Sequence, residues 1–184
     1  MGLRDRRQQR HENRRQFGFG GGASRYLMRQ KLLAFGDDFW VENADEERVV
    51  RVNGKALRLR HTRDLESPDG AKLCRIQTRV LHVRDTMAIE LPDGTPIALV
   101  HKALISPLRE RWKVDVENGP DLEVRGNIVD HEYEIESDGH KLAEVSKKWF
   151  RVRDTYGLEI APAGDTVLLI AVSVALDAMA HPEK

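Results

Sequence analysis

The sequence predicts a mainly β protein in which about twelve strands form a closed barrel around a C-terminal hydrophobic helix. Three observations support this prediction: short segments that alternate apolar and polar residues, an internal repeat of roughly 70 residues, and one apolar helical segment near the C-terminus. The chain has 184 residues, of which 40% are hydrophobic and 33% are charged. This is enough apolar material for one core and argues against wholesale disorder.

Short strands separated by turn signals follow one another from about Tyr26 onward. The turn signals are pairs such as Asn53-Gly54, Asp93-Gly94 and Asp138-Gly139, which favour tight hairpin turns. Many short strands at this spacing are typical of a barrel or a sandwich. The expected strands are 26–34, 39–43, 48–52, 56–61, 72–77, 80–85, 87–91, 96–104, 111–117, 122–125, 131–136, 141–146, 149–153 and 157–160.

The chain also repeats itself at a shift of 69 residues. Val83-Arg84-Asp85-Thr86 recurs as Val152-Arg153-Asp154-Thr155, and Asp69-Gly70 recurs as Asp138-Gly139. The match includes turns as well as strands, so we expect two copies of a unit with about six strands each. By alternation, the side chains expected to face inward are Leu81 and Val83 in the first copy, and Phe150 and Val152 in the second.

The segment 166–180 predicts the helix at the centre of the barrel. Asp165 is a good N-cap and Pro182 is a stop signal. After the opening Thr166, only Ser173 and Asp177 are polar within the segment, so the helix is hydrophobic almost all round and must be buried. At 1.5 Å per residue it spans roughly 22 Å, which is less than the roughly 30 Å of a bilayer core. We expect Ser173 to bond a backbone carbonyl and Asp177 to reach the barrel mouth.

Charge is unevenly distributed along the chain. Thirty Lys and Arg balance thirty Asp and Glu, which excludes a global polyanion-binding charge. Residues 1–25 nevertheless carry seven arginines against Asp5 and Glu12, and four glycines lie within 17–22. We expect a basic, Gly-rich disordered arm at 1–25 and a barrel domain at 26–184, with its core helix at 165–180. The electrostatic residues of the arm are Arg4, Arg6, Arg7, Arg10, Arg14 and Arg15.

Cysteine and histidine usage gives no sign of catalysis or metal binding. The single cysteine, Cys74, excludes an internal disulfide framework and matches Ala143 in the other copy, as a small buried residue would. None of the seven histidines has HxH or HExxH spacing, and Asp130-His131-Glu132 would alternate faces on a strand. We therefore expect no metal, no cofactor and no enzymatic activity, in a cytoplasmic protein that can also lie at the membrane periphery.

Several segments resemble the LURP-one-related family. They are Tyr26-Leu27-Met28-Arg29-Gln30-Lys31, Phe39-Trp40-Val41, Asn53-Gly54-Lys55, and Tyr156 to Pro162 followed by the apolar helix. The resemblance covers about residues 26–180 and implies a twelve-stranded barrel around a hydrophobic helix, the fold of tubby C-terminal domains and phospholipid scramblases. Tubby domains bind phosphoinositide headgroups through basic residues, and scramblases act on membrane phospholipids. The resemblance implies no catalytic motif.

The expected function is a non-enzymatic module that binds anionic phospholipid or phosphoinositide at a membrane surface. Converging Lys and Arg side chains can hold lipid phosphates, because a guanidinium matches phosphate oxygens in a bidentate fork. The alternative for these residues is a solvated outer face interleaved with acids. The alternative function is an interaction scaffold whose basic arm engages a partner protein or nucleic acid. The candidate lipid-binding residues are Arg109, Arg111, Lys113, Lys147, Lys148, Arg151 and Arg153.

Overall fold

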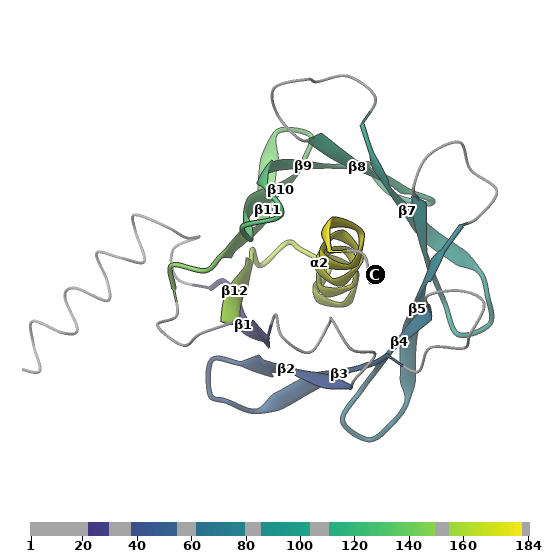
Figure 1. Ribbon diagram of the computed structural model, residues 1–184, viewed down its shortest axis with the longest axis vertical. Helices are drawn as coiled ribbons and strands as arrows, with labels where there is room; N and C mark the ends of the chain where they lie inside the picture. The colour runs from purple at the N-terminus through teal and green to yellow at the C-terminus, as the bar shows by residue number, and fades with distance from the viewer. Residues whose placement is uncertain are drawn as a thin grey trace, which may run out of the picture.

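The computed structural model describes residues 22–29, 38–54, 62–79, 86–103, 111–149 and 155–181. In this part of the chain, twelve antiparallel strands close into a barrel and the helix α2 runs through it (Figure 1). The predicted fold class is confirmed. The elements are β1 Ser24–Arg29, β2 Phe39–Asn43, β3 Arg48–Asn53, β4 Thr62–Glu66, β5 Lys72–Thr78, β6 Thr86–Glu90, β7 Pro96–Lys102, β8 Arg111–Val116, β9 Leu122–Asn127, β10 Glu132–Ser137, β11 His140–Ser146, β12 Thr155–Ile160 and α2 Thr166–Ala180.

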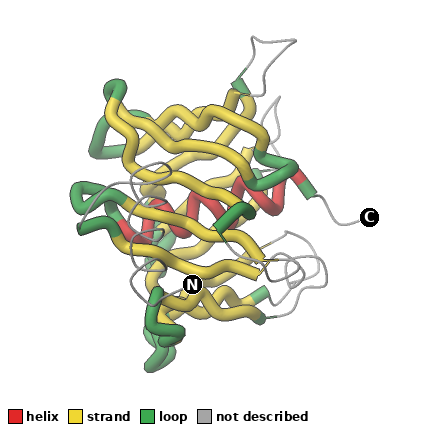
Figure 2. Tube along the Cα trace, turned by 90° about the vertical axis from the view of Figure 1, so that its left-hand side faces the viewer, coloured by secondary structure: helices red, strands yellow, loops and turns green. Residues whose placement is uncertain are grey.

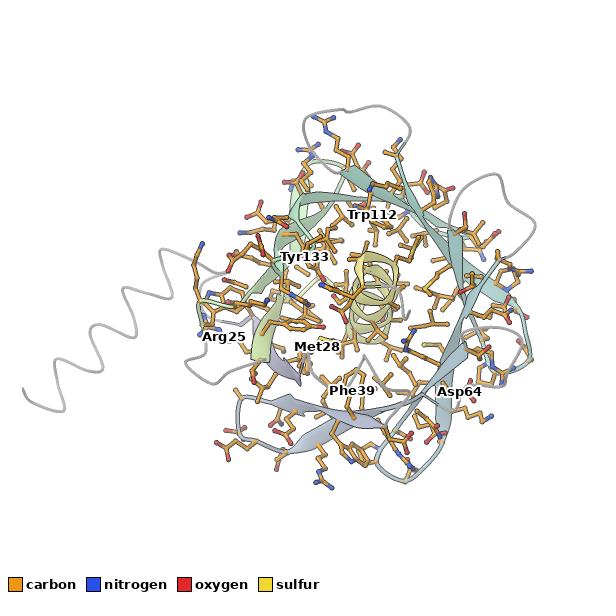
Figure 3. All side chains as sticks on the ribbon, in the orientation of Figure 1. Arg25, Met28, Phe39, Asp64, Trp112 and Tyr133 are labelled. Atoms are coloured by element: carbon orange, nitrogen blue, oxygen red, sulfur yellow. The ribbon has the colours of Figure 1, made fainter. Side chains whose placement is uncertain are left out.

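Alternating side chains give the barrel an apolar interior and a charged exterior. In β8, Trp112 and Val114 are buried while Arg111 and Lys113 are exposed. Such alternation places successive side chains on opposite faces of the sheet. Figure 3 shows inward-pointing side chains of this kind, including Trp112, gathered around α2. The helix packs against β5, β6, β7 and β12.

The two predicted copies form the two halves of the barrel. The first copy forms β1 to β6 and the second forms β7 to β12. Each strand pairs with its neighbours in the sequence, and β1 pairs with β12 to close the ring. Lys72 opens β5, and Lys141, which lies 69 residues later, falls in β11 at the matching position. Cys74 and Ala143 are both buried, as the match between them predicted.

Some expected strands were placed wrongly. β4 (Thr62–Glu66) was not predicted, because its sequence TRDLE carries three charged residues. Arg63 and Leu65 nevertheless point inward and are buried. The apolar–polar alternation of the sequence did not predict this, because one of the two inward-facing residues is charged. The strand expected at 131–136 begins one residue later, at Glu132. The strands expected at 56–61 and 80–85, most of 149–153, and the inward-facing residues assigned within them lie outside the described residues.

The barrel closes through β1, which pairs with β12 on one side and with β2 on the other. This strand begins at Ser24, two residues before the boundary expected at Tyr26. Arg25 belongs to it and donates two hydrogen bonds to Oε2 of Glu159, at 3.1 and 3.0 Å. Arg25 is therefore part of the barrel, whereas residues 1–21, with the six arm arginines, lie outside the described residues.

The helix α2 forms as its sequence predicts. The side chain of Asp165 accepts a hydrogen bond from the backbone N–H of Leu168 at 3.0 Å, which caps the N-terminus. Residues 169–177 are all buried. Ser173 Oγ donates to the carbonyl of Leu169 at 2.9 Å, as expected. Among the described residues, no helix combines the length and apolarity needed to cross a membrane.

The two ends of the barrel differ. β12 leads through residues 161–165 into α2, so the helix starts at the same end as the turns 44–47, 67–71, 91–95, 117–121 and 138–139. We call this the turn end. The helix runs to the opposite end, the helix-exit end, where the turn 128–131 and residues 147–149 also lie. In Figure 2 the helix crosses the barrel between these two ends, with the C-terminus on the right.

Candidate functional site

The turn end of the barrel is strongly acidic. Its six described turns contain no lysine or arginine, and all of their acidic side chains are exposed. An anionic surface would repel this end. The exposed acids of these turns are Asp45, Glu46, Glu47, Asp69, Asp93, Glu117, Asp121, Asp138 and Asp165.

Of the described candidates for lipid binding, Arg111, Lys147 and Lys148 lie toward the helix-exit end, whereas Lys113 lies midway along β8 and lines a cavity with Asp121 and Asp138 of the turn end. Arg111 opens β8 and Lys113 follows on the same outward face, while Lys147 and Lys148 come directly after β11. The side chain of Lys148 is 70% exposed and its Nζ lies 3.2 Å from Oε2 of Glu132, so it lies at the rim and not in the interior. Within the described part of the chain, Arg111, Lys113 and Lys147 form no side-chain ion pair.

The structure does not bring these candidates into one cluster. β9 and β10 separate β8 from β11, so Arg111 and Lys113 lie on a different side of the barrel from Lys147 and Lys148. Arg125, which lies opposite Arg111 in the β8–β9 register, extends the first group and was not among the candidates. The remaining three, Arg109, Arg151 and Arg153, lie outside the described residues.

Next to Arg111, acids are interleaved with the cations on the outer face of β8 to β10. Arg125 contacts Oε2 of Glu123 at 2.7 Å and Oε2 of Glu136 at 2.9 Å. The hydrogen bond from Arg125 lowers the pKa of Glu123, and the charges of Lys113 and Arg111 lower it further. A nearby cavity of about 300 Å³ does not suit an anion, because four carboxylates line it against two cations. Its lining residues are Lys113, Asp121, Leu122, Glu123, Arg125, Glu136, Asp138 and Gly139.

A buried polar cluster lies inside the helix-exit end. Nε2 of His131 is 2.5 Å from Oδ1 of Asp177, and Nδ1 of His181 is 3.3 Å from the same oxygen. The His131 ring lies between the ring of Tyr156, at a centroid distance of 4.2 Å, and that of His181, at 5.4 Å. Burial raises the pKa of the Tyr156 hydroxyl, and the carboxylate of Asp177 raises it further.

Sequence spacing missed this cluster, because His131 and Asp177 are 46 positions apart. Asp177 was expected at the barrel mouth, and it lies at that end of the helix but only 2% exposed. His131 was expected on a strand, but it lies in the β9–β10 turn with a positive φ of 54°. The one available signal was Asp177, an acid in an otherwise apolar helix, four residues before His181.

Comparison with known proteins agrees with the fold described above. Residues 24–177, from the first strand to the buried aspartate of the helix, match the LURP-one-related family. The chain belongs to the LURP-one-related family. Its relative YxjI from Bacillus subtilis (strain 168) is 24% identical over 158 residues, which cover 86% of this chain and 94% of YxjI.

A solved structure shares the fold of this LURP-one-related chain. The X-ray structure of a protein from Arabidopsis thaliana superposes with a TM-score of 0.60 at 12% sequence identity, covering 86% of this chain and 92% of the plant protein. At this identity the similarity concerns the fold alone. The family expected from the sequence is therefore confirmed, and so is the barrel around a helix that the resemblance implied.

Proposed function

We propose that this LURP-one-related protein is a non-enzymatic module that binds anionic phospholipid or phosphoinositide at a membrane surface, with its helix-exit end toward the membrane. The observation that supports this proposal most directly is the difference in charge between the two ends of the barrel. The described turns of the turn end are acidic and lack Lys and Arg, whereas Arg111, Lys147 and Lys148 lie toward the other end.

The charge distribution favours one orientation at an anionic surface. Each Lys or Arg near such a membrane contributes about 1 kcal/mol, and the attraction decays within a Debye length. Exposed cations on several strands of one rim can act together without forming a pocket, which agrees with their spread from β8 to β11. The acids of the turn end are kept away from the surface in this orientation, because the barrel lies between them and the membrane.

The full chain should be sedimented with vesicles of neutral phosphatidylcholine and with vesicles that also contain phosphatidylserine or a phosphoinositide. The rim variant Lys147→Glu with Lys148→Glu should reduce partition onto anionic vesicles about thirtyfold or more, since two contributions of about 1 kcal/mol are lost. The matched control, Arg48→Glu with Lys72→Glu, makes the same change in net charge beside the turn end and should bind like the wild type. Thermal unfolding checks that both variants fold.

A second rim variant, Arg111→Glu with Lys113→Glu, tests Arg111 at the rim together with its outward-facing neighbour on β8. A full-length variant with glutamine at the six arm arginines separates the arm from the rim. The proposal is wrong if the wild-type chain pellets with no anionic vesicle at moderate salt, or if the rim and control variants bind equally. Binding that disappears with the arm charges alone, and survives in both rim variants, would also contradict it.

A further inference from the structure

One ionisable side chain lies in the buried stretch 169–177 of α2, and it contacts two imidazoles. This side chain is Asp177, and its Oδ1 oxygen is approached by Nε2 of His131 at 2.5 Å and by Nδ1 of His181 at 3.3 Å. The two rings come from the β9–β10 turn and from the end of the helix, so the fold alone brings them together. The three ligand-type atoms lie within 4.8 Å of one another.

Hydrogen bonding within the described structure does not satisfy the groups around this carboxylate. His131 is 1% exposed, and its Nδ1 atom has no hydrogen-bond partner. The hydroxyl of Tyr156, whose ring packs on His131, is also buried without a partner. Buried polar groups are normally hydrogen-bonded, and a bound water molecule or ion nearby is one explanation for exceptions such as these.

The position in the helix favours a cation. Asp177 and His181 lie at the C-terminus of α2, where the last carbonyl groups carry partial negative charge. The Asp177 carboxylate adds a full negative charge in a buried position, which is costly unless a cation or strong donors compensate it. Two histidines and one carboxylate are also a ligand set that zinc-class metals use in proteins.

We propose that His131, Asp177 and His181 bind a divalent transition metal ion of the zinc class. In a tetrahedral site with bonds of about 2.0–2.1 Å, neighbouring ligand atoms lie about 3.3 Å apart. The Asp177–His181 separation already has this value. The His131–Asp177 contact of 2.5 Å needs to widen by about 0.8 Å, which an inserted cation would bring about by replacing the direct contact. The side chain of His181 is 36% exposed, so the fourth position opens toward solvent.

The test uses the full chain, treated with EDTA and then dialysed. Titration with Zn²⁺ or Co²⁺ should show one ion per chain by calorimetry, and Co²⁺ should give the visible absorption of a tetrahedral site. At a hundredfold excess over Kd, the metal should raise Tm by about 5–10 °C, and EDTA should reverse the rise. His181→Gln should weaken binding at least a hundredfold, while its metal-free Tm stays close to that of the wild type.

His140→Gln is the matched control, because His140 is exposed at the opposite end of the barrel. It should bind metal like the wild type. His181→Cys supplies a different zinc ligand and should restore binding, with a sulfur-to-Co²⁺ charge-transfer band. The proposal is wrong if neither metal shows saturable binding, or if His181→Gln and His140→Gln bind equally. Since the proposal depends only on the contacts of these three residues, vesicle binding can fail without affecting it.

Discussion

Asp177 in the core helix and His131 in the β9–β10 turn form a buried pair that joins the helix to the barrel wall. Their side chains are 2% and 1% exposed, and the 2.5 Å contact between Oδ1 and Nε2 connects positions 46 residues apart. Apart from a hydrogen bond between the Ser173 and Tyr133 side chains, the described contacts of the helix with the wall are mainly apolar packing, which has little directional preference. This pair therefore fixes the rotation and depth of α2 relative to β9 and β10.

Removing one partner of this pair should strongly destabilise the barrel. We expect Asp177→Ala to lower the free energy of unfolding by about 3–5 kcal/mol, because it leaves His131 buried without its partner. Denaturant unfolding in EDTA measures the change. The matched control is Asp115→Ala, which removes the acid of an outer-face pair whose His101–Asp115 distance is 3.6 Å and whose acid is 53% exposed. It should cost less than about 1 kcal/mol, and equal losses in the two variants would contradict the argument.

Gly126 should tolerate no side chain. Its φ is +132°, and a Cβ built there would lie 2.4 Å from the carbonyl oxygen of Glu132 and 2.7 Å from Cα of Tyr133. We expect Gly126→Ala to cost about 2–3 kcal/mol, since both the backbone conformation and the close approach oppose it. Gly94→Ala is the control, because φ there is +88° with no atom within 4 Å of the added Cβ. That variant should lose only about 1 kcal/mol, and Tm values that match between the two would disprove the role of close packing.

Asp64 should contribute to acid sensitivity. Burial raises its pKa, but hydrogen bonds from Arg75 and Lys72 outweigh burial and hold the pKa below its ordinary value of 3.8. A carboxylate with a lowered pKa stabilises the folded state above the unfolded-state value, and this contribution is lost as pH falls through the folded-state value. Stability measured from pH 6 downward should therefore fall less steeply below about pH 4 in Asp64→Asn, by about 1 kcal/mol overall. Asp45→Asn, at an exposed turn, should keep the wild-type slope.

Cys74 should be unreactive in the native protein. Burial is the main cause that raises the pKa of its thiol from 9.0 to about 12. At pH 8 the thiolate fraction is then roughly a thousandfold below that of an ordinary thiol. Iodoacetamide should leave the folded chain unmodified and should label it rapidly in denaturant, as mass spectrometry would show. Rapid labelling of the folded chain would mean that this part of β5 opens to solvent.

Local sequence patterns predicted most of the barrel. The alternation in β8 and the Asp-Gly turns depend on residues within one strand or one hairpin, where side-chain direction follows from spacing, and the internal repeat extended this to the match of Cys74 with Ala143. The helix was equally predictable, because Asp165 caps it and its apolar surface extends all round. β4 was missed because three charged residues in five conceal the inward-facing pair Arg63 and Leu65.

The sequence by itself therefore determined the fold class, the repeat, the core helix and the family, since each is encoded in short-range spacing that recurs along the chain. Only the tertiary structure decided which side chains from distant segments meet. Strand pairing and the direction of α2 separate the acidic turns from Arg111 and Lys147, and they bring His131 to Asp177. Such contacts depend on how the strands pair around the barrel and on the left-handed conformation of His131 in its turn. Local periodicity in the sequence predicts neither of these.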